Sequence, residues 1–399
     1  MMTTIDLKSP EWVDLQKRMV GWRRDIHRNP EIGNHLPRTS AYVQKVLKEL
    51  GISFQLFVEG NSLVGLIPGR EEGRTIALRA DMDGLPVRED TGLPFASENG
   101  CMHACGHDGH TAMLLGAAAW LSAHREAFSG QVKLFFQSGE EYPGGAEPMI
   151  REGCLENPHV DAVFGMHAGQ MSPEVPQGKI AYIKGPIMAA MDRLYIQVHG
   201  RGGHGAYPHT CIDPIVLASE IVLALQTLIS RELNPTEAAV LSITRISGGF
   251  NQNIIPDTVE LEGTVRTLHP ETRVWLAERI RAVAEGLAAA RGARVEIEHS
   301  FNYPAVINDD AMTDLVVNAA RKVLSAEALY PLKSPVMSGE DFSFYQEKVP
   351  GCFVFMSNPG FIQGKFNGHH SPRFDLDESM FSAGAALHCQ TALDFLNRC

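Results

Sequence analysis

A run of nine residues around position 105 gathers many of the side chains that could bind a metal ion. The segment Met-His-Ala-Cys-Gly-His-Asp-Gly-His, residues 102–110, holds three imidazoles, a thiol and a carboxylate. Its glycines would let the backbone bend around a bound ion. Imidazole, thiolate and carboxylate groups are the ligands that zinc and related divalent metals prefer. A single histidine in such a loop is more often structural, but so many candidate ligands together predict a metal site.

Two adjacent acids, Glu140 and Glu141, follow a predicted strand at residues 132–137. Gly139 and the turn at 143–145 beside them indicate a tight loop. Taken alone, the pair would be interpreted as a solvated loop. Beside a metal site, one acid could bind metal while its neighbour carries protons, which is the division of labour that metal-assisted hydrolysis needs.

Further histidines lie far from this segment in the sequence. His167 follows a predicted strand at residues 160–166, and His369 and His370 precede Ser-Pro in a glycine-rich stretch. Each of these positions, taken singly, could equally hold a ligand or a structural residue.

The elements that must position these side chains alternate between helix and strand. Helices are predicted from apolar residues at three- and four-residue intervals, and strands from short apolar runs. The predicted helices are 12–26, 42–50, 111–124, 146–151, 311–324 and 379–397, and the predicted strands are 63–67, 75–80, 132–137, 160–166 and 352–356. This order predicts an α/β domain with a mainly parallel sheet and helices on both faces. Asp81, Asp83, Glu140, Glu141 and His167 each follow a strand, so we expect them to meet in one crevice at the carboxyl ends of the strands.

The pattern changes between residues 186 and 300. Strands are predicted at 194–198, 240–246, 259–267 and 295–299, with helices at 214–229 and 271–291. That order is typical of a ferredoxin-like α+β domain. We therefore predict an inserted dimerisation or lid domain at 186–300, and a metal-binding catalytic domain made of residues 1–185 and 301–399.

The composition excludes several classes of protein. With 44% hydrophobic and 21% charged residues, the composition of the chain matches that of ordinary soluble globular proteins. A net charge of -12 does not favour the positively charged surface that nucleic-acid binding needs. The longest nearly pure apolar run, 112–121, is too short to span a membrane, and the N-terminus lacks the apolar core of a signal peptide. We expect a cytoplasmic protein that binds no membrane. Seven thinly spread cysteines without a C-x-x-C pair do not indicate a disulfide framework or a zinc knuckle.

Short motifs run along almost the whole chain. They are RRDIHRNPE (23–31), RADMDGLP (79–86), MHACGHDGH (102–110), GEE (139–141), GMH (165–167), GRGGHGAYPH (200–209), NIIPD (253–257), GTVRT (263–267), SGEDFSFY (338–345) and HHSP (369–372). In this order they resemble the aminoacylase and carboxypeptidase family of dinuclear metallohydrolases, especially the branch with bacterial hippurate hydrolases and plant auxin-conjugate amidohydrolases. The resemblance implies a zinc-exopeptidase-like fold for the first domain.

The resemblance also implies roles for individual residues. Two divalent ions per subunit, of zinc, manganese, cobalt or nickel, would be bound by five ligands: Cys105, His107, Glu141, His167 and His370. Glu140 would be the general base, and Asp83 would buttress the metal centre. Three residues of the inserted domain would act on the substrate: His204 as a catalytic group that stabilises the oxyanion, and Asn253 and Arg266 as binding groups.

This chain departs from the wider family at two places. Much of the family has His-x-Asp where this chain has Asp81-Met82-Asp83, and the thiol of Cys105 would compensate for the missing histidine. Whether Asp81 touches metal stays open, and we expect His103 and His110 to lie outside the ligand set. The stretch 33–37 lacks an acidic residue that the family pattern would place there.

The activity that the resemblance implies is metal-dependent hydrolysis of an N-acyl amino acid, either hippurate-like or another N-acyl or N-aroyl conjugate. A metal-activated water would attack the amide carbonyl, and Glu140 would carry its proton to the leaving amine. The chain is expected to form a homodimer or a dimer of dimers, with His204 supplied to the partner. The alternatives are a dipeptidase or carboxypeptidase of the same family, an inactive metal-binding homologue, and a thiol enzyme that uses Cys105 with His107.

Overall fold

The computed structural model describes residues 5–397, which divide into two compact units. The large unit comprises the chain up to Ile187 together with the segments Ile307–Pro335 and 341 onward. The small unit comprises Met188–Val306 and the short segment Val336–Glu340. The small unit therefore covers nearly the residues predicted for the inserted domain, but it also takes in a segment that the sequence did not indicate.

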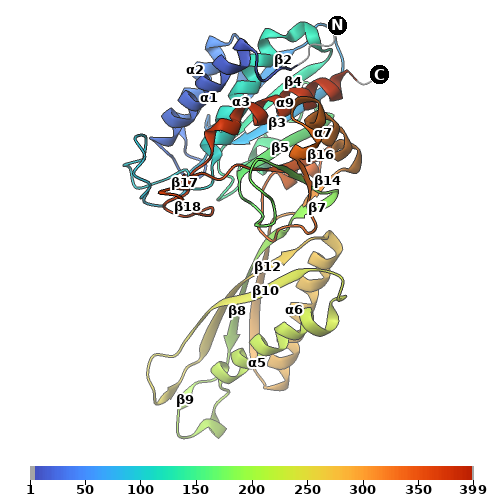
Figure 1. Ribbon diagram of the computed structural model, residues 1–399. Helices are drawn as coiled ribbons and strands as arrows, with labels where there is room; N and C mark the ends of the chain where they lie inside the picture. Colours follow the sequence, from blue (N-terminus) through green and yellow to red (C-terminus); the bar gives the residue numbers. More distant parts are fainter. Residues whose placement is uncertain (1–4, 398–399) are drawn as a thin grey trace. The chain divides into compact units, whose positions relative to one another are not determined.

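A mixed sheet forms the centre of the large unit (Figure 1). Within the described residues it has eight strands in the order β1-β2-β4-β3-β5-β16-β6-β15. The central strands β4, β3, β5 and β16 are parallel, whereas β1 and β2 are antiparallel to their neighbours and β6 is antiparallel to β16. The strands are β1 Ser53–Phe57, β2 Ser62–Pro68, β3 Thr75–Asp81, β4 Gln131–Gln137, β5 Ala162–Gly169, β6 Ile180–Tyr182, β15 Leu329–Pro331 and β16 Gly351–Ser357. The predicted parallel arrangement thus describes the middle of the sheet, and its margins are mixed.

Helices cover both faces of this sheet, as the sequence predicts. They are α1 Pro10–His27, α2 Pro37–Glu49, α3 His107–Ala123, α4 Ala146–Arg151, α7 Asp310–Val323, α8 Ser343–Gln346 and α9 Phe381–Leu396. The strands β3, β5 and β16 are buried along their whole length because helices pack on both sides of them. Short 3-10 turns and the β17–β18 hairpin (Phe361–Ile362 and Lys365–Phe366) complete the large unit.

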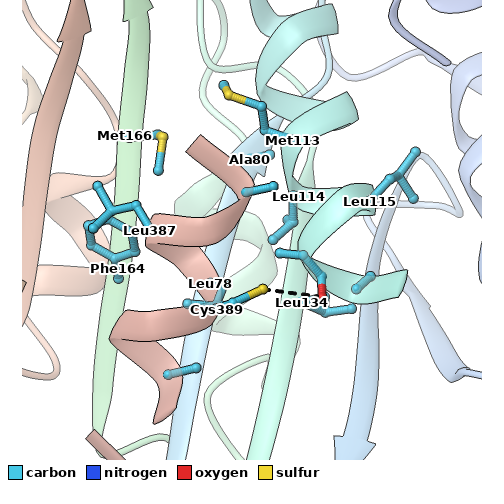
Figure 2. Close-up of a cluster of buried hydrophobic side chains, with 14 of the residues drawn as sticks. Leu78, Ala80, Met113, Leu114, Leu115, Leu134, Phe164, Met166, Leu387 and Cys389 are labelled. Atoms are coloured by element: carbon cyan, nitrogen blue, oxygen red, sulfur yellow. Dashed lines mark hydrogen bonds between the residues drawn. The ribbon is translucent and has the colours of Figure 1, made fainter. Parts of the chain in front are cut away.

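The core on one face is built by α3 and α9 (Figure 2). Figure 2 shows side chains from both helices meeting those of β3, β4 and β5: Leu78, Ala80, Met113, Leu114, Leu134, Phe164, Met166, Leu387 and Cys389. Truncating one of these buried side chains, for example Leu114 to alanine, would cost about 2–5 kcal/mol. On the other face α8 supplies Tyr345, whose ring lies 5.3 Å from that of Phe135 on β4. This packing fixes the positions of the strand ends that carry the polar residues.

The small unit has the predicted ferredoxin-like arrangement. Its antiparallel sheet of four strands has the order β10-β12-β8-β13, and α5 and α6 pack on one face (Figure 1). The elements are β8 Ala190–His199, α5 Pro214–Thr227, β10 Ala239–Gly248, β12 Thr258–Thr267, α6 Pro270–Ala290 and β13 Arg294–Tyr303. A separate two-stranded ladder joins β9 Gly203–His204 to β11 Ile254–Ile255. The strands β7 Gly185–Met188 and β14 Val306–Asn308 lie where the chain enters and leaves this unit.

The helical stretch Pro214–Glu232 is long and apolar enough to cross a membrane, judged by length and composition only. In the structure, 33% of its most apolar window is buried. One side packs on the small unit's sheet through buried leucine and isoleucine side chains. The opposite side carries exposed apolar residues: Ile215, Val216 and Leu223. The stretch is therefore a core helix of the small unit with a second apolar face.

Candidate metal centre

Side chains from five separate segments of the large unit meet at the carboxyl ends of its central strands. Within the described part of this unit, four overlapping groups hold ligand atoms that lie within 4.8 Å of one another: Cys105, His107 and His167; Asp81, His107 and His110; Cys105, Glu141 and His370; His107, Glu140 and Glu141. The structure therefore brings together all five residues that the family resemblance suggests as ligands, with Glu140 among them.

The first turn of α3 positions two of these histidines. The predicted helix at 111–124 begins earlier, at His107, because Gly106 takes the left-handed conformation (φ 92°) at the N-cap. A Cβ atom at Gly106 would also come within 3.1 Å of Leu376. His107 and His110 are three residues apart in the helix, so their rings lie side by side with centroids 5.4 Å apart.

Hydrogen bonds fix which nitrogen of His107 and His167 faces the cluster. The Nδ1 atom of His107 lies 3.3 Å from an Asp83 oxygen, and its buried Nε2 atom has no hydrogen-bond partner within residues 5–397. In His167, Nδ1 donates to the Ala168 carbonyl at 2.8 Å, and Nε2 lies 3.4 Å from the Cys105 sulfur. A carboxylate or carbonyl behind an imidazole is the usual support for a metal-binding nitrogen. Both residues thus fit a metal ion.

The charges in the cluster also fit a cation. Burial alone would lower the pKa of His107, but the nearby carboxylates of Asp81, Asp83 and Glu141 raise it to about 10. Burial raises the pKa of the Cys105 thiol well above its usual value, and Glu141, Glu140 and Asp81 raise it further. The cluster therefore holds an excess of negative charge, and a thiolate at position 105 needs a nearby cation to be stable.

His110 has both ring nitrogens engaged within the protein. Its Nδ1 atom lies 2.6 Å from an Asp81 oxygen, and its Nε2 atom accepts the Ala168 N–H at 2.7 Å. Asp81 also accepts a bond from Arg79 at 2.9 Å. Burial opposes ionisation of Asp81, but His107, His110 and Arg79 outweigh burial and hold the pKa of Asp81 well below its usual value. His110 in this arrangement has no free lone pair for a metal ion.

His103 belongs to none of the ligand groups found in the described residues. It is buried, its two ring nitrogens have no hydrogen-bond partner in the described part of the chain, and burial lowers its pKa to about 3. Its ring lies 6.2 Å from that of His27. His103 is therefore a neutral packing residue behind the cluster.

The sequence drew attention to the pair His369-His370 but assigned a role only to the second residue. The Nε2 atom of His370 lies 3.0 Å from a Glu141 oxygen, and its backbone is left-handed (φ 63°) with its N–H donating to the Ala104 carbonyl. His369 also reaches the cluster, with Nδ1 3.7 Å from the Cys105 sulfur. No spacing rule separates two adjacent histidines, so the position of His369 could not be predicted.

Asp83 holds the loop that carries the two acids. One of its oxygens accepts the Glu140 N–H and the other accepts the Glu141 N–H, both at 3.1 Å. The same carboxylate contacts His107, so one residue links α3 to the acidic loop. The Glu140 side chain is buried, whereas Glu141 is partly exposed.

The motif RRDIHRNPE is explained by an ion cluster that joins α1 to α3. Asp108 accepts bonds from Arg23 and His27, each at 2.7 Å. Arg23 also contacts Asp375 at 2.9 Å and Glu378 at 3.1 Å. Removing one partner from such a buried cluster costs about 3–5 kcal/mol. The cluster fastens the helix turn next to His107.

Two of the three predicted substrate residues lie together in the small unit. His204 on β9 pairs with Ile254 on β11, and the Gly205 N–H donates to the Asn253 carbonyl at 2.8 Å. The Nδ1 atom of His204 accepts the Ala206 N–H at 3.0 Å, so in the neutral ring the proton is on Nε2. His204 is exposed.

Arg266 lies near the C-terminal end of β12, in the four-stranded sheet of the small unit. The β9–β11 ladder adjoins the beginning of β12, where the Gly202 N–H donates to Asp257. From Thr258 to Arg266, β12 extends about 26 Å at roughly 3.3 Å per residue. Arg266 is half-buried, its pKa is lowered by burial, and its buried Nη1 atom has no hydrogen-bond partner among the described residues. This nitrogen could bind a carboxylate.

Comparisons with known proteins identify the family of this chain. The model of peptidase family M20/M25/M40 matches residues 77–394. The chain is 41% identical to the N-acetyl-L-cysteine deacetylase of Bacillus subtilis, in an alignment that covers 92% of this chain and 85% of that protein. It is 37% identical to the IAA-amino acid hydrolase ILR1-like 4 of Arabidopsis thaliana, in an alignment that covers 95% of this chain and 86% of that protein. The structure also resembles that of the Bacillus subtilis YXEP protein, which is described as a dinuclear metal binding peptidase from the M20 family. The two superpose with a TM-score of 0.83 at 36% sequence identity, over 96% of this chain and 99% of that chain. This chain is accordingly a hydrolase that belongs to peptidase family M20/M25/M40.

Proposed function

We propose that this enzyme hydrolyses the amide bond of N-acyl amino acids, with Glu140 as the general base beside two divalent metal ions. The observation that carries the proposal is the placement of Glu140 next to Glu141 in a cluster with five candidate ligands. The names of two relatives, one for N-acetylcysteine and one for indole-acetyl conjugates of amino acids, support N-acyl amino acids as the substrate class.

The metal ligands in this proposal are Cys105, His107, Glu141, His167 and His370. Their mixture of sulfur, nitrogen and oxygen donors suits zinc, and it is also acceptable to manganese, cobalt and nickel. When bound, the ions would polarise the substrate carbonyl and make water more acidic. The Nε2 atom of His107 supports this assignment, because it is buried, has no hydrogen-bond partner among the described residues and lies 3.7 Å from an Asp81 oxygen.

Protein groups would supply the remaining chemistry. Glu140 accepts the proton of the attacking water and passes it to the leaving amine. The Asp83 carboxylate keeps Glu140 in place by accepting a hydrogen bond from the backbone N–H of Glu140. The Nε2–H of His204 donates to the oxyanion, and Arg266 binds the free carboxylate of the amino acid, a partner that its planar guanidinium fits.

The distance within the small unit supports a homodimer. An N-acyl amino acid is about 10 Å long, two or three residues at roughly 3.5 Å each, whereas β12 alone separates the His204 end from Arg266 by about 26 Å. One substrate molecule cannot reach both residues of the same chain. We therefore assign His204 to the site of a partner chain, with the exposed apolar face of α5, including Leu223, as the pairing surface.

A substrate panel tests the proposed specificity. We expect turnover of N-acetyl, N-benzoyl or N-indoleacetyl amino acids after reconstitution with zinc, manganese, cobalt or nickel, and loss of turnover on chelation. The matched control is the carboxamide of each substrate, which keeps the scissile amide but lacks the anion for Arg266 and should react at least about tenfold more slowly, since an ionic hydrogen bond is worth about 1.5–3 kcal/mol. Faster cleavage of dipeptides would favour a dipeptidase or carboxypeptidase, and no turnover with any metal would favour an inactive homologue.

The thiol of Cys105 gives a second test. A metal-bound sulfur is not free to react, so maleimide should label Cys105 much faster in the apo enzyme than in the metal-loaded enzyme. Peptide mapping by mass spectrometry locates the label, and Cys101, whose side chain is partly exposed whereas that of Cys105 is buried, serves as the internal control. Labelling of Cys105 at the same measurable rate in both forms would show that it is not a ligand.

A further inference from the structure

The loop of residues 138–145 carries both acids of the proposed chemistry, and its own turn is closed by one backbone bond, from the Gly144 N–H to the Gly139 carbonyl. Short loops of this kind depend on surrounding residues for a fixed shape. Asp83 holds the middle of the loop through the N–H groups of Glu140 and Glu141. Two other side chains, far away in sequence, hold its ends.

Asn34 bridges the two ends of the loop. Its side-chain oxygen accepts the Ser138 hydroxyl at 2.8 Å, and its side-chain nitrogen donates to the Gly144 carbonyl at 3.1 Å. The Ser138 hydroxyl in turn lies 2.8 Å from the hydroxyl of Ser62 on β2. A Cβ atom at Gly139 would lie only 2.2 Å from the Asn34 oxygen. The amide thus fills the space inside the loop and leaves room there only for glycine.

Asp341, in the motif SGEDFSFY, holds the point where the loop enters α4. One oxygen accepts the N–H groups of Gly145 and Ala146, at 2.9 and 3.0 Å. The other accepts Arg79 at 2.9 Å and Gln137 at 2.8 Å. Asp341 is fully buried, and burial raises its pKa, while the hydrogen bonds from Arg79, Gln137 and the two N–H groups oppose that shift.

We propose that Asn34 and Asp341 are positioning residues that set the place of Glu140 by fixing the two ends of its loop. The inference rests on the proposed role of Glu140 as the base. Proton transfer needs heavy atoms within about 2.6–3.2 Å of each other. A loop released at its ends would still bind metal through the other ligands, but it would hold the base at the wrong distance. The segment 33–37, which departs from the family pattern, thus contributes a contact to the reaction site.

The experiment compares Asn34→Ala with His35→Ala. His35 is the neighbouring residue, and its side chain is exposed. At saturating metal, we expect Asn34→Ala to lower kcat about tenfold to a hundredfold, because a shift of about 1 Å has effects of that size, with KM near the wild-type value. His35→Ala should keep the wild-type kcat. The substrate is the N-acyl amino acid of the panel that the wild-type enzyme hydrolyses fastest.

Additional variants separate positioning from simple loss of structure. Ser138→Ala removes a group through which Asn34 acts, so the kcat losses of Asn34→Ala and Ser138→Ala should be less than additive in the double variant. Asp341→Asn should lower kcat with the same unchanged KM, provided that its melting temperature shows a folded protein. A wild-type kcat for Asn34→Ala, in an enzyme that Glu140→Gln inactivates, overturns the positioning role alone. Full activity of Glu140→Gln overturns the proposed function instead.

Discussion

Replacement of Glu140 by glutamine is expected to abolish nearly all turnover while the metal ions stay bound. Glutamine has almost the same shape, but its amide cannot accept a proton from water. General-base catalysis contributes about 10²–10⁴-fold to rates, so kcat should fall by at least that range. Metal content and hydrolysis rate are to be measured on the same preparation, so that loss of metal is not mistaken for loss of the base.

The matched control is Glu141→Gln, the same chemical change at the adjacent position. Because Glu141 is the proposed ligand, this variant should lose metal affinity and regain activity at higher metal concentration, whereas Glu140→Gln should not respond to added metal. Near-wild-type turnover of metal-loaded Glu140→Gln would rule it out as the base.

Activity is expected to return when two inactive variants, His204→Ala and Glu140→Gln, are mixed. If His204 acts in the site of its partner, a mixed dimer has one site with both defects and one site with both residues intact. Random exchange yields mixed dimers in about half of the population, so about one quarter of the wild-type activity should appear. The measurement is the hydrolysis rate after exchange, with dimer composition followed by native mass spectrometry.

Two controls make this experiment decisive. Mixing Glu140→Gln with the double variant Glu140→Gln/His204→Ala must give no activity, since every site then lacks the base. Adding Leu223→Asp to both chains should prevent recovery, because a charge on the exposed apolar face of α5 disfavours pairing there. Confirmed exchange without recovered activity would contradict the trans assignment.

The elements with a clear apolar period could be predicted from the sequence. The helix at 146–151 has the predicted ends, and the strand expected at 352–356 is β16 with one more residue at each end. The sequence missed the short strands β1, β6, β7, β9, β11, β14, β15, β17 and β18. These strands have two to five residues, so they are too short to show a periodic pattern.

The candidate site was predictable in its residue types but not in its contacts. Cysteine, histidine and paired acids in the family's motifs indicate ligands from the sequence alone. The contacts depend on how separate loops meet in the folded chain. Both ring nitrogens of His110 form hydrogen bonds, to Asp81 and to a backbone N–H, and His369 lies close to the sulfur of Cys105. Asn34 carries no chemical signal at all, since only the folded loop shows what its amide binds.

His370 combines a left-handed backbone, which costs stability, with a side chain that is a candidate metal ligand. A residue with a Cβ atom pays about 1–2 kcal/mol for this conformation, and glycine would avoid that cost while keeping the N–H bond to Ala104. The same change would remove an imidazole from the cluster. Laboratory evolution that selects for heat resistance alone would therefore favour glycine here and yield a more stable protein that lacks one candidate metal ligand.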